Sequence, residues 1–173
     1  MLQPTTTARL ILRRPRPSDA QDFFDIFSDA QTCRMDGGYP PYTAMDDAFR
    51  RDFDAVVRDG ENRLFIEEAS SGKMIGLLHV MPSDLPGQFE IGYVIHCAFR
   101  LRGYATEAVR ALLSLLQGAG AVRVLATCYA FNDASAALLR RLGFTEGEPV
   151  PNEKHPEFSE RSFMRILRCG GGA

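Results

Sequence analysis

The chain has 173 residues, of which 45% are hydrophobic and 24% charged, and its net charge is −2. These values are ordinary for a globular protein, and they predict one domain over residues 1–168 with a disordered tail over 169–173. A net charge so close to zero provides no basic field for nucleic acid or for an anionic membrane, so we expect neither as a partner.

The four cysteines are scattered, without a CxxC pair or the Cys/His spacing of a zinc site, so we expect no metal. Cys97 and Cys128 lie in or beside apolar stretches and are expected to be buried free thiols, as in a reducing cytoplasm. The sequence shows no signal-peptide pattern, and its longest apolar stretch, 74–81, is too short to cross a bilayer. We therefore expect a cytoplasmic protein.

The first third of the chain predicts a strand followed by two helices. The strand is expected over 9–14, and the capping-box pattern of Ser18 and Gln21 places a helix start there. A loop is expected over 35–42 and a second helix over 43–57. The aromatic side chains of the first helix are expected to pack in the core: Phe23, Phe24 and Phe27.

The middle of the chain predicts the central part of a sheet. Strands are expected over 63–69 and 73–81, joined as a hairpin. Alternating residues predict a strand over 90–96, and apolar residues at three- and four-residue spacing predict a helix over 105–116. A strand over 122–129 would then lie parallel to the one before the helix, through a right-handed crossover.

The last part predicts a short helix from Asn132 or Asp133 to Arg141, capped by one of these two side chains. A strand is expected to start over 144–146 and the last strand over 158–167. Residues 149–156 between them form a polar loop.

The turn between the central strand and helix has the features of an anion site. It spans Arg100 to Ala105 and contains two arginines and Gly103, directly before a helix N-terminus. The first N–H groups of a helix have no partner within the helix, and the helix dipole is positive there. The phosphate-binding patterns GxxxxGK[ST] and GxGxxG are absent. The residues alone favour a phosphate-bearing ligand, with an ordinary connection carrying two solvated arginines as the alternative.

A resemblance to a known family extends this interpretation. The segment FRLRGYATEAV, residues 99–109, resembles the acetyl-CoA-binding signature R/Q-x-x-G-x-G/A of the GCN5-related N-acetyltransferase (GNAT) superfamily. Asn132 to Ser135, followed by the Leu-Gly-Phe of 142–144, is similar to a second pattern of that family. Residues 7–13 resemble the opening strand of the branch that acetylates the N-termini of ribosomal proteins.

The resemblance implies the GNAT fold. This is an α/β fold with a mixed, mostly antiparallel sheet of six to seven strands, flanking helices and a central parallel pair that is splayed apart. It also implies that the pantetheine arm of acetyl-CoA enters between the strands at 93–97 and 124–129. The helical segment near the N-terminus would form one wall of the acceptor cleft, where Tyr39 and Tyr42 either line the pocket or anchor the loop.

By the same resemblance, the backbone near the end of the central strand would hold the pantetheine arm. The backbone amides of the turn would hold the pyrophosphate, two arginines would add charge-assisted contacts, and an asparagine would bond the pantetheine. The cosubstrate-binding residues predicted in this way are Ile95, Arg100, Leu101, Arg102, Gly103, Tyr104, Ala105, Thr106 and Asn132.

The implied reaction is direct attack of a neutral amine on the thioester. A lysine amine, with a pKa of ~10.4, needs a stronger base than an α-amine at ~7.8. Glu90 is the best candidate for a base acting through water, although a solvent-facing strand glutamate is an equal alternative. Ser135 fits the family position of the acid that protonates the departing thiolate of coenzyme A. The alternative is a serine at a helix N-terminus whose hydroxyl satisfies a backbone N–H. Glu153 and Glu160 are weaker candidates, read as exposed loop carboxylates, and His96 is expected to be structural.

The leading hypothesis is an N-acetyltransferase that uses acetyl-CoA to modify a protein N-terminus or a small amine, as a monomer or homodimer. A non-catalytic acyl-CoA sensor or partner-binding module is the alternative, since an intact phosphate turn would serve both. A nucleotide-phosphate enzyme is disfavoured by the missing phosphate-binding patterns. The acceptor would be chosen by the loops 35–42 and 149–156.

Overall fold

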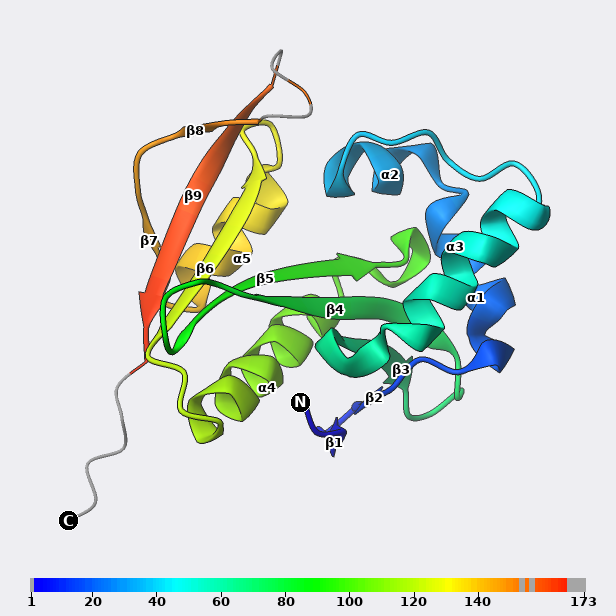
Figure 1. Ribbon diagram of the computed structural model, residues 1–173, viewed down its shortest axis with the longest axis horizontal. Helices are drawn as coiled ribbons and strands as arrows, with labels where there is room; N and C mark the ends of the chain where they lie inside the picture. Colours follow the sequence, from blue (N-terminus) through cyan, green and yellow to red (C-terminus); the bar gives the residue numbers. More distant parts are fainter. Residues whose placement is uncertain (1, 153–154, 156–157, 168–173) are drawn as a thin grey trace. The chain divides into compact units, whose positions relative to one another are not determined.

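The computed structural model describes residues 2–152, 155 and 158–167 (Figure 1). The chain forms two compact units, one of residues 1–79 and 93–111 and the other of residues 80–92 and 112–173. Each unit is described on its own below. The tail predicted over 169–173, together with Glu153, lies outside the described residues.

The first unit is built on antiparallel strands that follow one another in the chain. The strand order is β1-β2-β3-β4-β5, and β1 pairs with β2, β2 with β3 and β3 with β4 in antiparallel fashion. The strand expected at the N-terminus and the predicted hairpin are thereby confirmed. The strands are β1 (Thr5–Thr6), β2 (Leu10–Arg13), β3 (Arg63–Glu68), β4 (Met74–Pro82) and β5 (Gln88–Ile95), the last two of which continue in the second unit.

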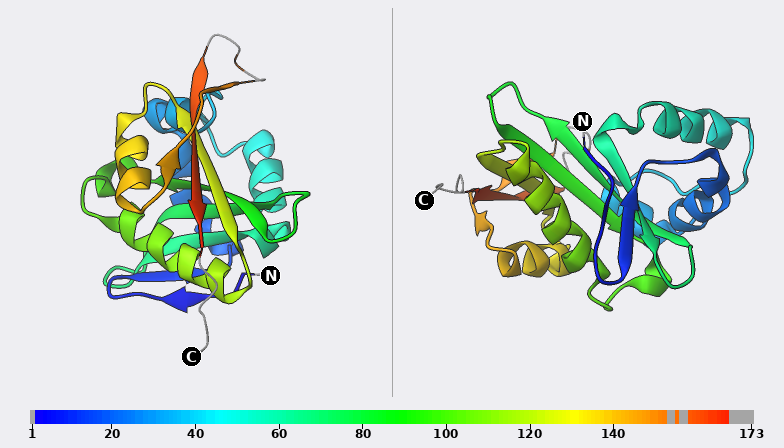
Figure 2. Two further views of the ribbon diagram at one scale, coloured as in Figure 1. Left: turned by 90° about the vertical axis from the view of Figure 1, so that its left-hand side faces the viewer. Right: turned by 90° about the horizontal axis from the view of Figure 1, so that it is seen from below.

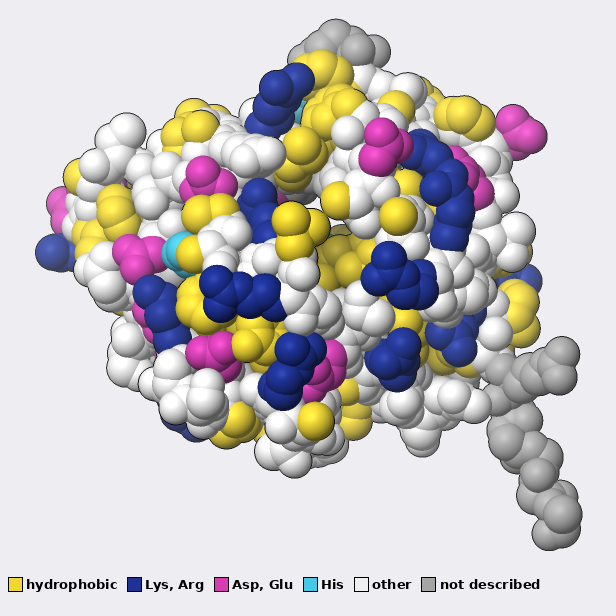
Figure 3. Space-filling model, turned by 180° about the vertical axis from the view of Figure 1, so that it is seen from behind, with side chains coloured by type: hydrophobic (Ala, Val, Ile, Leu, Met, Phe, Trp, Pro, Cys, Tyr) yellow, Lys and Arg dark blue, Asp and Glu magenta, His cyan; other side chains and the backbone are white. Residues whose placement is uncertain are grey.

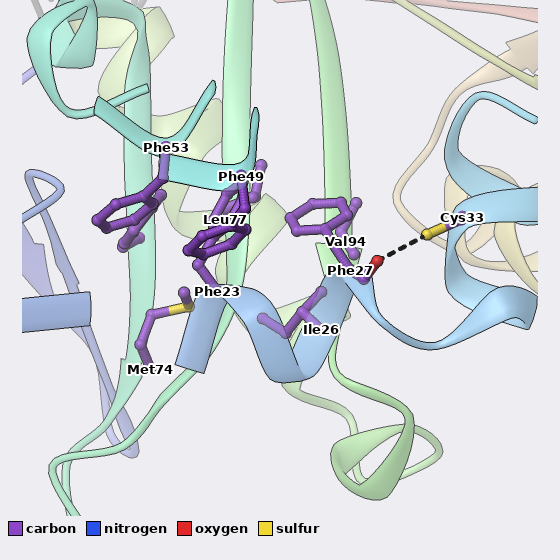
Figure 4. Packing of buried hydrophobic residues seen from close by; sticks show 10 residues of the cluster. Phe23, Ile26, Phe27, Cys33, Phe49, Phe53, Met74, Leu77 and Val94 are labelled. Atoms are coloured by element: carbon purple, nitrogen blue, oxygen red, sulfur yellow. Dashed lines mark hydrogen bonds between the residues drawn. The ribbon is translucent and has the colours of Figure 1, made fainter. Parts of the chain in front are cut away.

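Aromatic side chains from two helices fill the core of the first unit, as Figure 4 shows. The ring of Phe23 lies 4.5 Å from that of Phe27 and 5.2 Å from that of Phe53, centroid to centroid. Phe24 is half-buried and meets Phe49 edge-on at 5.5 Å. The predicted core role of these phenylalanines is confirmed. The helices of this region are η1 (Pro17–Asp19), α1 (Ala20–Phe27), α2 (Ala30–Asp36), α3 (Asp47–Arg58) and η2 (Gly60–Asn62).

The first helix starts in a different way from the sequence prediction. The first turn, η1, is held by Asp19 rather than by Ser18: Asp19 is its third residue, and its Oδ2 accepts a hydrogen bond from the backbone N–H of Arg16, the N-cap residue, at 2.7 Å. The same carboxylate binds the buried guanidinium of Arg13 through two bonds of 2.8 and 2.7 Å. A buried cation must be paired, so the acid that pairs with Arg13 also sets the helix start. The Asp19 hydrogen bond, opposed by burial, raises the pKa of Arg13.

Helix α2 was not predicted, and it takes the place of the beginning of the loop expected over 35–42. Asp29 is its N-cap and accepts a hydrogen bond from the backbone N–H of Thr32 at 2.9 Å. The second predicted helix is confirmed as α3, which starts after its own N-cap, Asp46.

Helix α4 (Tyr104–Gly118) follows η3 (Cys97–Phe99), and its first half belongs to the first unit. Figure 2 shows the beginning of α4 on the side of the first unit's strands that faces away from α1 and α3. β5 lies very close to β4 here, because a Cβ atom at Gly76 would be 2.3 Å from the carbonyl oxygen of Val94. Only glycine fits at that place in β4.

The second unit contains the predicted parallel pair. β5 and β6 run parallel, with Gln88–Glu90 opposite Arg123–Leu125, and β6 pairs antiparallel with β9 along its whole length. The strand order is β4-β5-β6-β9-β7, and β8 also pairs with β9. Its further elements are β6 (Arg123–Tyr129), α5 (Asp133–Arg141), β7 (Thr145–Glu146), β8 (Val150–Pro151) and β9 (Ser159–Ile166).

The predicted fold class is confirmed as a mixed, mostly antiparallel α/β arrangement with one parallel pair and flanking helices. The predicted number of six to seven strands was too low, since nine are present in the described residues. The strand expected to start over 144–146 is confirmed as β7. The two further strands, β1 and β8, have only two residues each, too few for an alternating pattern to show. No helix in the described ranges is long and apolar enough to cross a membrane.

Candidate active site

The turn before α4 has a backbone shape that exposes its amides. Leu101 and Gly103 both have positive φ angles, of 62° and 82°. A leucine rarely adopts this conformation, and the side chain of Leu101 is fully exposed, so no burial compensates for the strain. Such strain concentrates at functional sites.

The N–H groups of this turn are available for a ligand. Arg100 donates its N–H to the carbonyl of Cys97, and Glu107 donates its N–H to the carbonyl of Gly103 at 3.0 Å. Within the described part of the chain, no protein acceptor takes the N–H groups of residues 101–106 between them. The predicted pyrophosphate-binding amides therefore form one continuous run at the positive end of a 15-residue helix.

Arg9 holds this turn from the segment between β1 and β2. Its Nη1 donates a hydrogen bond of 3.0 Å to the carbonyl of Arg102, and its guanidinium carbon lies 4.5 Å from the centre of the Tyr104 ring. Its Nε donates to Oε2 of Glu107 at 2.8 Å. Arg9 thus contacts the turn and the first turn of the helix together.

The side chain of Tyr104 points into the protein. It is buried, and its hydroxyl donates a hydrogen bond to the Glu68 carboxylate on β3. That bond is the main cause that lowers the pKa of Glu68 and raises the pKa of Tyr104. The hydroxyl of Tyr104 is thus engaged within the protein, and a role of its backbone N–H in ligand binding stays a prediction.

The two arginines of the turn have different surroundings. The Nε of Arg100 donates a 3.0 Å hydrogen bond to the carbonyl of Ile95, and its Nη2 donates to Oγ1 of Thr32. Arg102 is exposed and its guanidinium lies over the ring of Phe99 at 5.4 Å. Figure 3 shows that Lys and Arg side chains on one face of the molecule lie among acidic and hydrophobic ones, which fits the small net charge.

The residues at the end of β5 hold the chain where it leaves the sheet. Ile95 is buried, and His96 donates its backbone N–H to the carbonyl of Ile75 at 2.8 Å. The Nδ1 of His96 accepts from the N–H of Ala98 at 3.1 Å, and burial lowers the pKa of this imidazole. Its ring therefore has a local structural partner. The prediction that Cys97 is buried was wrong, because it lies in the short η3 turn outside the sheet and is exposed.

Glu90, the predicted base, lies in the second unit. It is half-buried on β5 in the register of the parallel pair, opposite Leu125. Oγ1 of Thr127, an exposed residue of β6, donates a 3.4 Å hydrogen bond to its Oε1. The carboxylate is therefore oriented by a neighbouring strand rather than extended freely into solvent.

Asn132 and Ser135 lie together at the start of α5. The side-chain oxygen of Asn132 accepts from the backbone N–H of Ser135 at 3.1 Å and caps the helix. Burial raises the pKa of the Cys128 thiol. A hydrogen bond with the hydroxyl of Ser135 acts in the opposite direction but does not outweigh burial. The predicted burial of Cys128 is confirmed. Two predicted site residues thus meet, and the cap leaves the Asn132 amide nitrogen as the group that could bind a pantetheine.

Glu160, the other described candidate for a catalytic base, does not lie where it was expected. Glu160 is not in a loop but in β9 opposite Tyr129, and its Oε1 accepts a 2.6 Å hydrogen bond from Asn152. Across the described residues, no group of three or more His, Cys, Asp or Glu side chains could hold a metal ion.

The two tyrosines of the predicted acceptor wall are held by acids within the first unit. Tyr39 donates to Asp36, and Tyr42 donates to Oδ2 of Asp52 at 3.0 Å. Burial, followed by the bond to Asp52, raises the pKa of Tyr42 to about 12. Tyr42 also meets the ring of Phe49 edge-on at 5.1 Å, as expected of a residue that anchors a loop.

A comparison with known families agrees with this arrangement. The family model described as Acetyltransferase (GNAT) domain matches residues 9–145, which include the turn, Glu90, Asn132 and Ser135. The chain belongs to the GNAT acetyltransferase family. No curated protein matches this acetyltransferase significantly.

Solved structures show how widely the fold of this GNAT acetyltransferase is shared. A GNAT-family acetyltransferase from Bacillus anthracis superposes with a TM-score of 0.81 at 17% identity, over 95% of this chain and 98% of its own. RimL, the ribosomal L7/L12 alpha-N-protein acetyltransferase in complex with coenzyme A, gives 0.79 at 18%, over 96% and 99%. The microcin C7 self-immunity acetyltransferase MccE, in complex with acetyl-CoA and AMP, gives 0.80 at 17%, over 93% and 94%.

The sequence analysis missed the residues that support the turn of this acetyltransferase. Arg9 and Glu107 are 98 residues apart in the chain, and Thr32 and Arg100 are 68 apart. No local pattern connects such pairs. Asp29 alone was a readable N-cap signal, although no Glu or Gln follows three residues later and the helix behind it is short.

Proposed function

We propose that this protein transfers the acetyl group of acetyl-CoA to a primary amine by direct attack on the thioester. The observation that carries the proposal is the run of N–H groups from residue 101 to 106 without a protein acceptor, at the N-terminus of α4. These groups would bind the pyrophosphate, and Arg102 would add charge. The coenzyme A and acetyl-CoA named for RimL and MccE support the choice of cosubstrate.

The remaining site residues are assigned to the same reaction. The backbone at Ile95 would hold the pantetheine arm and polarise the thioester carbonyl, and the amide of Asn132 would bond the arm. Glu90 would accept the proton of the amine through water, oriented by Thr127. Ser135 would protonate the departing thiolate, whose modest basicity requires little help.

We propose an acceptor that is either a protein N-terminus or a small amine. The name of RimL supports the first class, since that protein acts on the N-terminus of ribosomal L7/L12, and the resemblance of residues 7–13 points the same way. The name of MccE specifies no acceptor, so the small-amine class rests on the resemblance to the family. A reducing cytoplasm suits both classes.

Two measurements test this proposal. Calorimetry with acetyl-CoA should show binding to the wild type and its loss in Gly103→Pro, because proline cannot adopt the φ of 82° that shapes the turn. Gly103→Ala is the milder variant: alanine can adopt this φ at a cost in strain, and its Cβ would meet only the Arg9 side chain at 3.4 Å, so we expect a smaller loss of affinity than in Gly103→Pro. Equal acetyl-CoA affinity in Gly103→Pro and the wild type would contradict the proposed site.

Turnover distinguishes the enzyme from the alternative, a non-catalytic acyl-CoA sensor. The release of free coenzyme A is measured with peptide N-termini, polyamines and aminoglycosides as acceptors. Acetylated product with one acceptor class supports the enzyme. Tight acetyl-CoA binding without product from any of the three classes favours the sensor.

A further inference from the structure

Arg100 is the first residue of the phosphate turn, but its side chain contacts the protein. The Nε group donates to the carbonyl of Ile95 at 3.0 Å, and Nη2 donates to the hydroxyl of Thr32 at 2.5 Å. The carboxylate of Asp29 lies 3.8 Å from the same Nη2. One guanidinium therefore connects the end of β5 with the N-terminus of α2.

The hydroxyl of Thr32 relays this connection in a fixed direction. It accepts the hydrogen bond from Arg100 and donates its own proton to Oδ2 of Asp29 at 2.5 Å. The Thr32 hydroxyl has one proton. Because its oxygen accepts a hydrogen bond from Arg100, that proton is free to be donated to Asp29. Thr32 is buried, although its side chain is polar. The N-cap of α2, Asp29, is thus connected to Arg100 through the buried hydroxyl of Thr32.

Helix α2 is short and buries few of its side chains. It has seven residues, and only Thr32 and Cys33 are buried. Helices of this length are not stable by themselves and depend on tertiary contacts. The thiol of Cys33 donates to the carbonyl of Phe27 at 3.2 Å, as Figure 4 shows, which ties α2 to α1. The bonds of Arg100 add a charged connection between α2 and β5.

The other end of the relay lies at the proposed cosubstrate site. The carbonyl of Ile95 has two lone pairs, one of which Arg100 uses, and belongs to the backbone proposed to hold the pantetheine arm. The backbone of Arg100 opens the turn proposed to hold the pyrophosphate. A ligand bound to the backbone at Ile95 and along the turn would also order the backbone of Arg100, and with it the Arg100 side chain.

We propose that Arg100 is a positioning residue that transmits occupancy of the cosubstrate site to helix α2 through Thr32 and Asp29. The inference rests on the proposed function, because it requires coenzyme A at the turn. Binding of coenzyme A at the turn would then make α2, and the residues that follow it toward Tyr39, more ordered than in the free protein.

Hydrogen exchange with coenzyme A as the probe tests this inference. Amide exchange is followed by mass spectrometry in peptides covering 29–38 and 101–112, with and without saturating coenzyme A. The wild type is compared with Thr32→Val and Arg100→Gln. Thr32→Val keeps the shape of the side chain and removes the relay hydroxyl. Thr43→Val, at an exposed threonine of the first unit, is the matched control.

In the wild type, we expect coenzyme A to slow exchange in both peptides by about tenfold, the factor that ~1.4 kcal/mol produces. In Thr32→Val, the protection of 101–112 should remain and that of 29–38 should be lost. Arg100→Gln should lose the same protection of 29–38. The double variant should lose no more than either single one, because both changes break one pathway. Thr43→Val should behave as the wild type.

Each contrary result has a definite meaning. Protection of 101–112 alone in the wild type overturns the relay and leaves the proposed function intact. Equal protection of 29–38 in Thr32→Val and the wild type also overturns it. A loss of coenzyme A affinity in Arg100→Gln as large as in Arg102→Ala, with Thr32→Val unaffected, would instead make Arg100 a direct phosphate ligand. Absence of coenzyme A binding to the wild type by calorimetry overturns both proposals.

Discussion

Arg9 binds the carboxylate of Glu107 with both its backbone and its side chain. The backbone N–H of Arg9 donates to Oε1 of Glu107 at 2.9 Å, and its Nε donates to Oε2 at 2.8 Å. Thr7 adds a hydroxyl bond of 2.6 Å to Oε1. An acid in the first turn of α4 interacts favourably with the helix dipole but would repel a pyrophosphate at the same place. Arg9 neutralises that acid and supports the turn at the carbonyl of Arg102.

Replacing Arg9 should therefore weaken acetyl-CoA binding. In Arg9→Ala, Glu107 keeps its charge without its guanidinium partner, and the carbonyl of Arg102 loses a donor. Because the Arg9 side chain is nearly half exposed, solvent screening limits the loss to about 1 kcal/mol, or roughly fivefold in Kd by calorimetry. Arg16→Ala, at an exposed arginine that follows β2, should bind normally. Recovery of affinity in the double variant Arg9→Ala/Glu107→Gln would identify the carboxylate as the cause, and full affinity in Arg9→Ala would contradict the role of Arg9.

The same carboxylate should make stability depend on pH on the acid side. Burial acts to raise the pKa of Glu107, but the hydrogen bonds from Thr7 and Arg9 outweigh it, so the pKa lies below the ordinary value of 4.5. A lowered pKa in the folded state gives stability that is fully present above about pH 4.5 and is lost as the pH falls through the folded-state value. Urea unfolding between pH 3 and 7 should show a steeper acid-side loss in the wild type than in Glu107→Gln. Parallel curves for the two proteins would contradict this, and Glu61→Gln provides an exposed control.

Asn132 offers a way to separate helix capping from ligand binding. Asparagine and aspartate cap helices about equally, whereas alanine at this position costs ~1 kcal/mol. Asn132→Asp should keep the bond to the Ser135 N–H and the stability, but lose the amide donor proposed for the pantetheine. We expect Asn132→Asp to reduce acetyl-CoA affinity without a change in the urea midpoint, and Asn132→Ala to reduce both. If Asn132→Asp binds acetyl-CoA as the wild type does, Asn132 has a capping role only.

Glu90 is tested through the pH dependence of turnover. An amine is mostly protonated at low pH, so the need for a base is greatest there. Glu90→Gln should lower kcat/KM mainly on the acid side of the profile, once the screen has identified an acceptor. Glu160→Gln, whose carboxylate is engaged by Asn152, is the matched control. An unchanged pH–rate profile in Glu90→Gln would remove Glu90 from the mechanism.

Much of the fold could be predicted because the central segments have long and regular patterns. The alternating residues of β5, the apolar spacing of α4 and the apolar run of β6 each cover seven residues or more. Helix α2 escaped prediction because its seven residues bury only two side chains, which leaves no periodic face to recognise. β1 and β8 were not expected, because they exist through pairing with a neighbour rather than through their own sequence.

The site was less predictable wherever a side chain chooses among distant partners. The glycine and the two arginines of the turn indicated an anion site, which stays a prediction, and the backbone there has positive φ angles at Leu101 and Gly103. The sequence did not reveal that one arginine faces the protein while the other faces solvent, because the partner of Arg100 lies 68 residues earlier. Similarly, the carbonyl of Arg102 is held by Arg9, which no spacing rule connects to the turn.

The boundaries between the two compact units fall inside β4, β5 and α4, at residues 79/80, 92/93 and 111/112. Neither unit is a continuous piece of the chain, and no single cut releases one of them whole. A fragment that ends before α4 would lack the helix that starts in one unit and finishes in the other. Attempts to express the ligand-binding part alone, or to exchange it between relatives at one junction, would therefore divide secondary-structure elements instead of linkers.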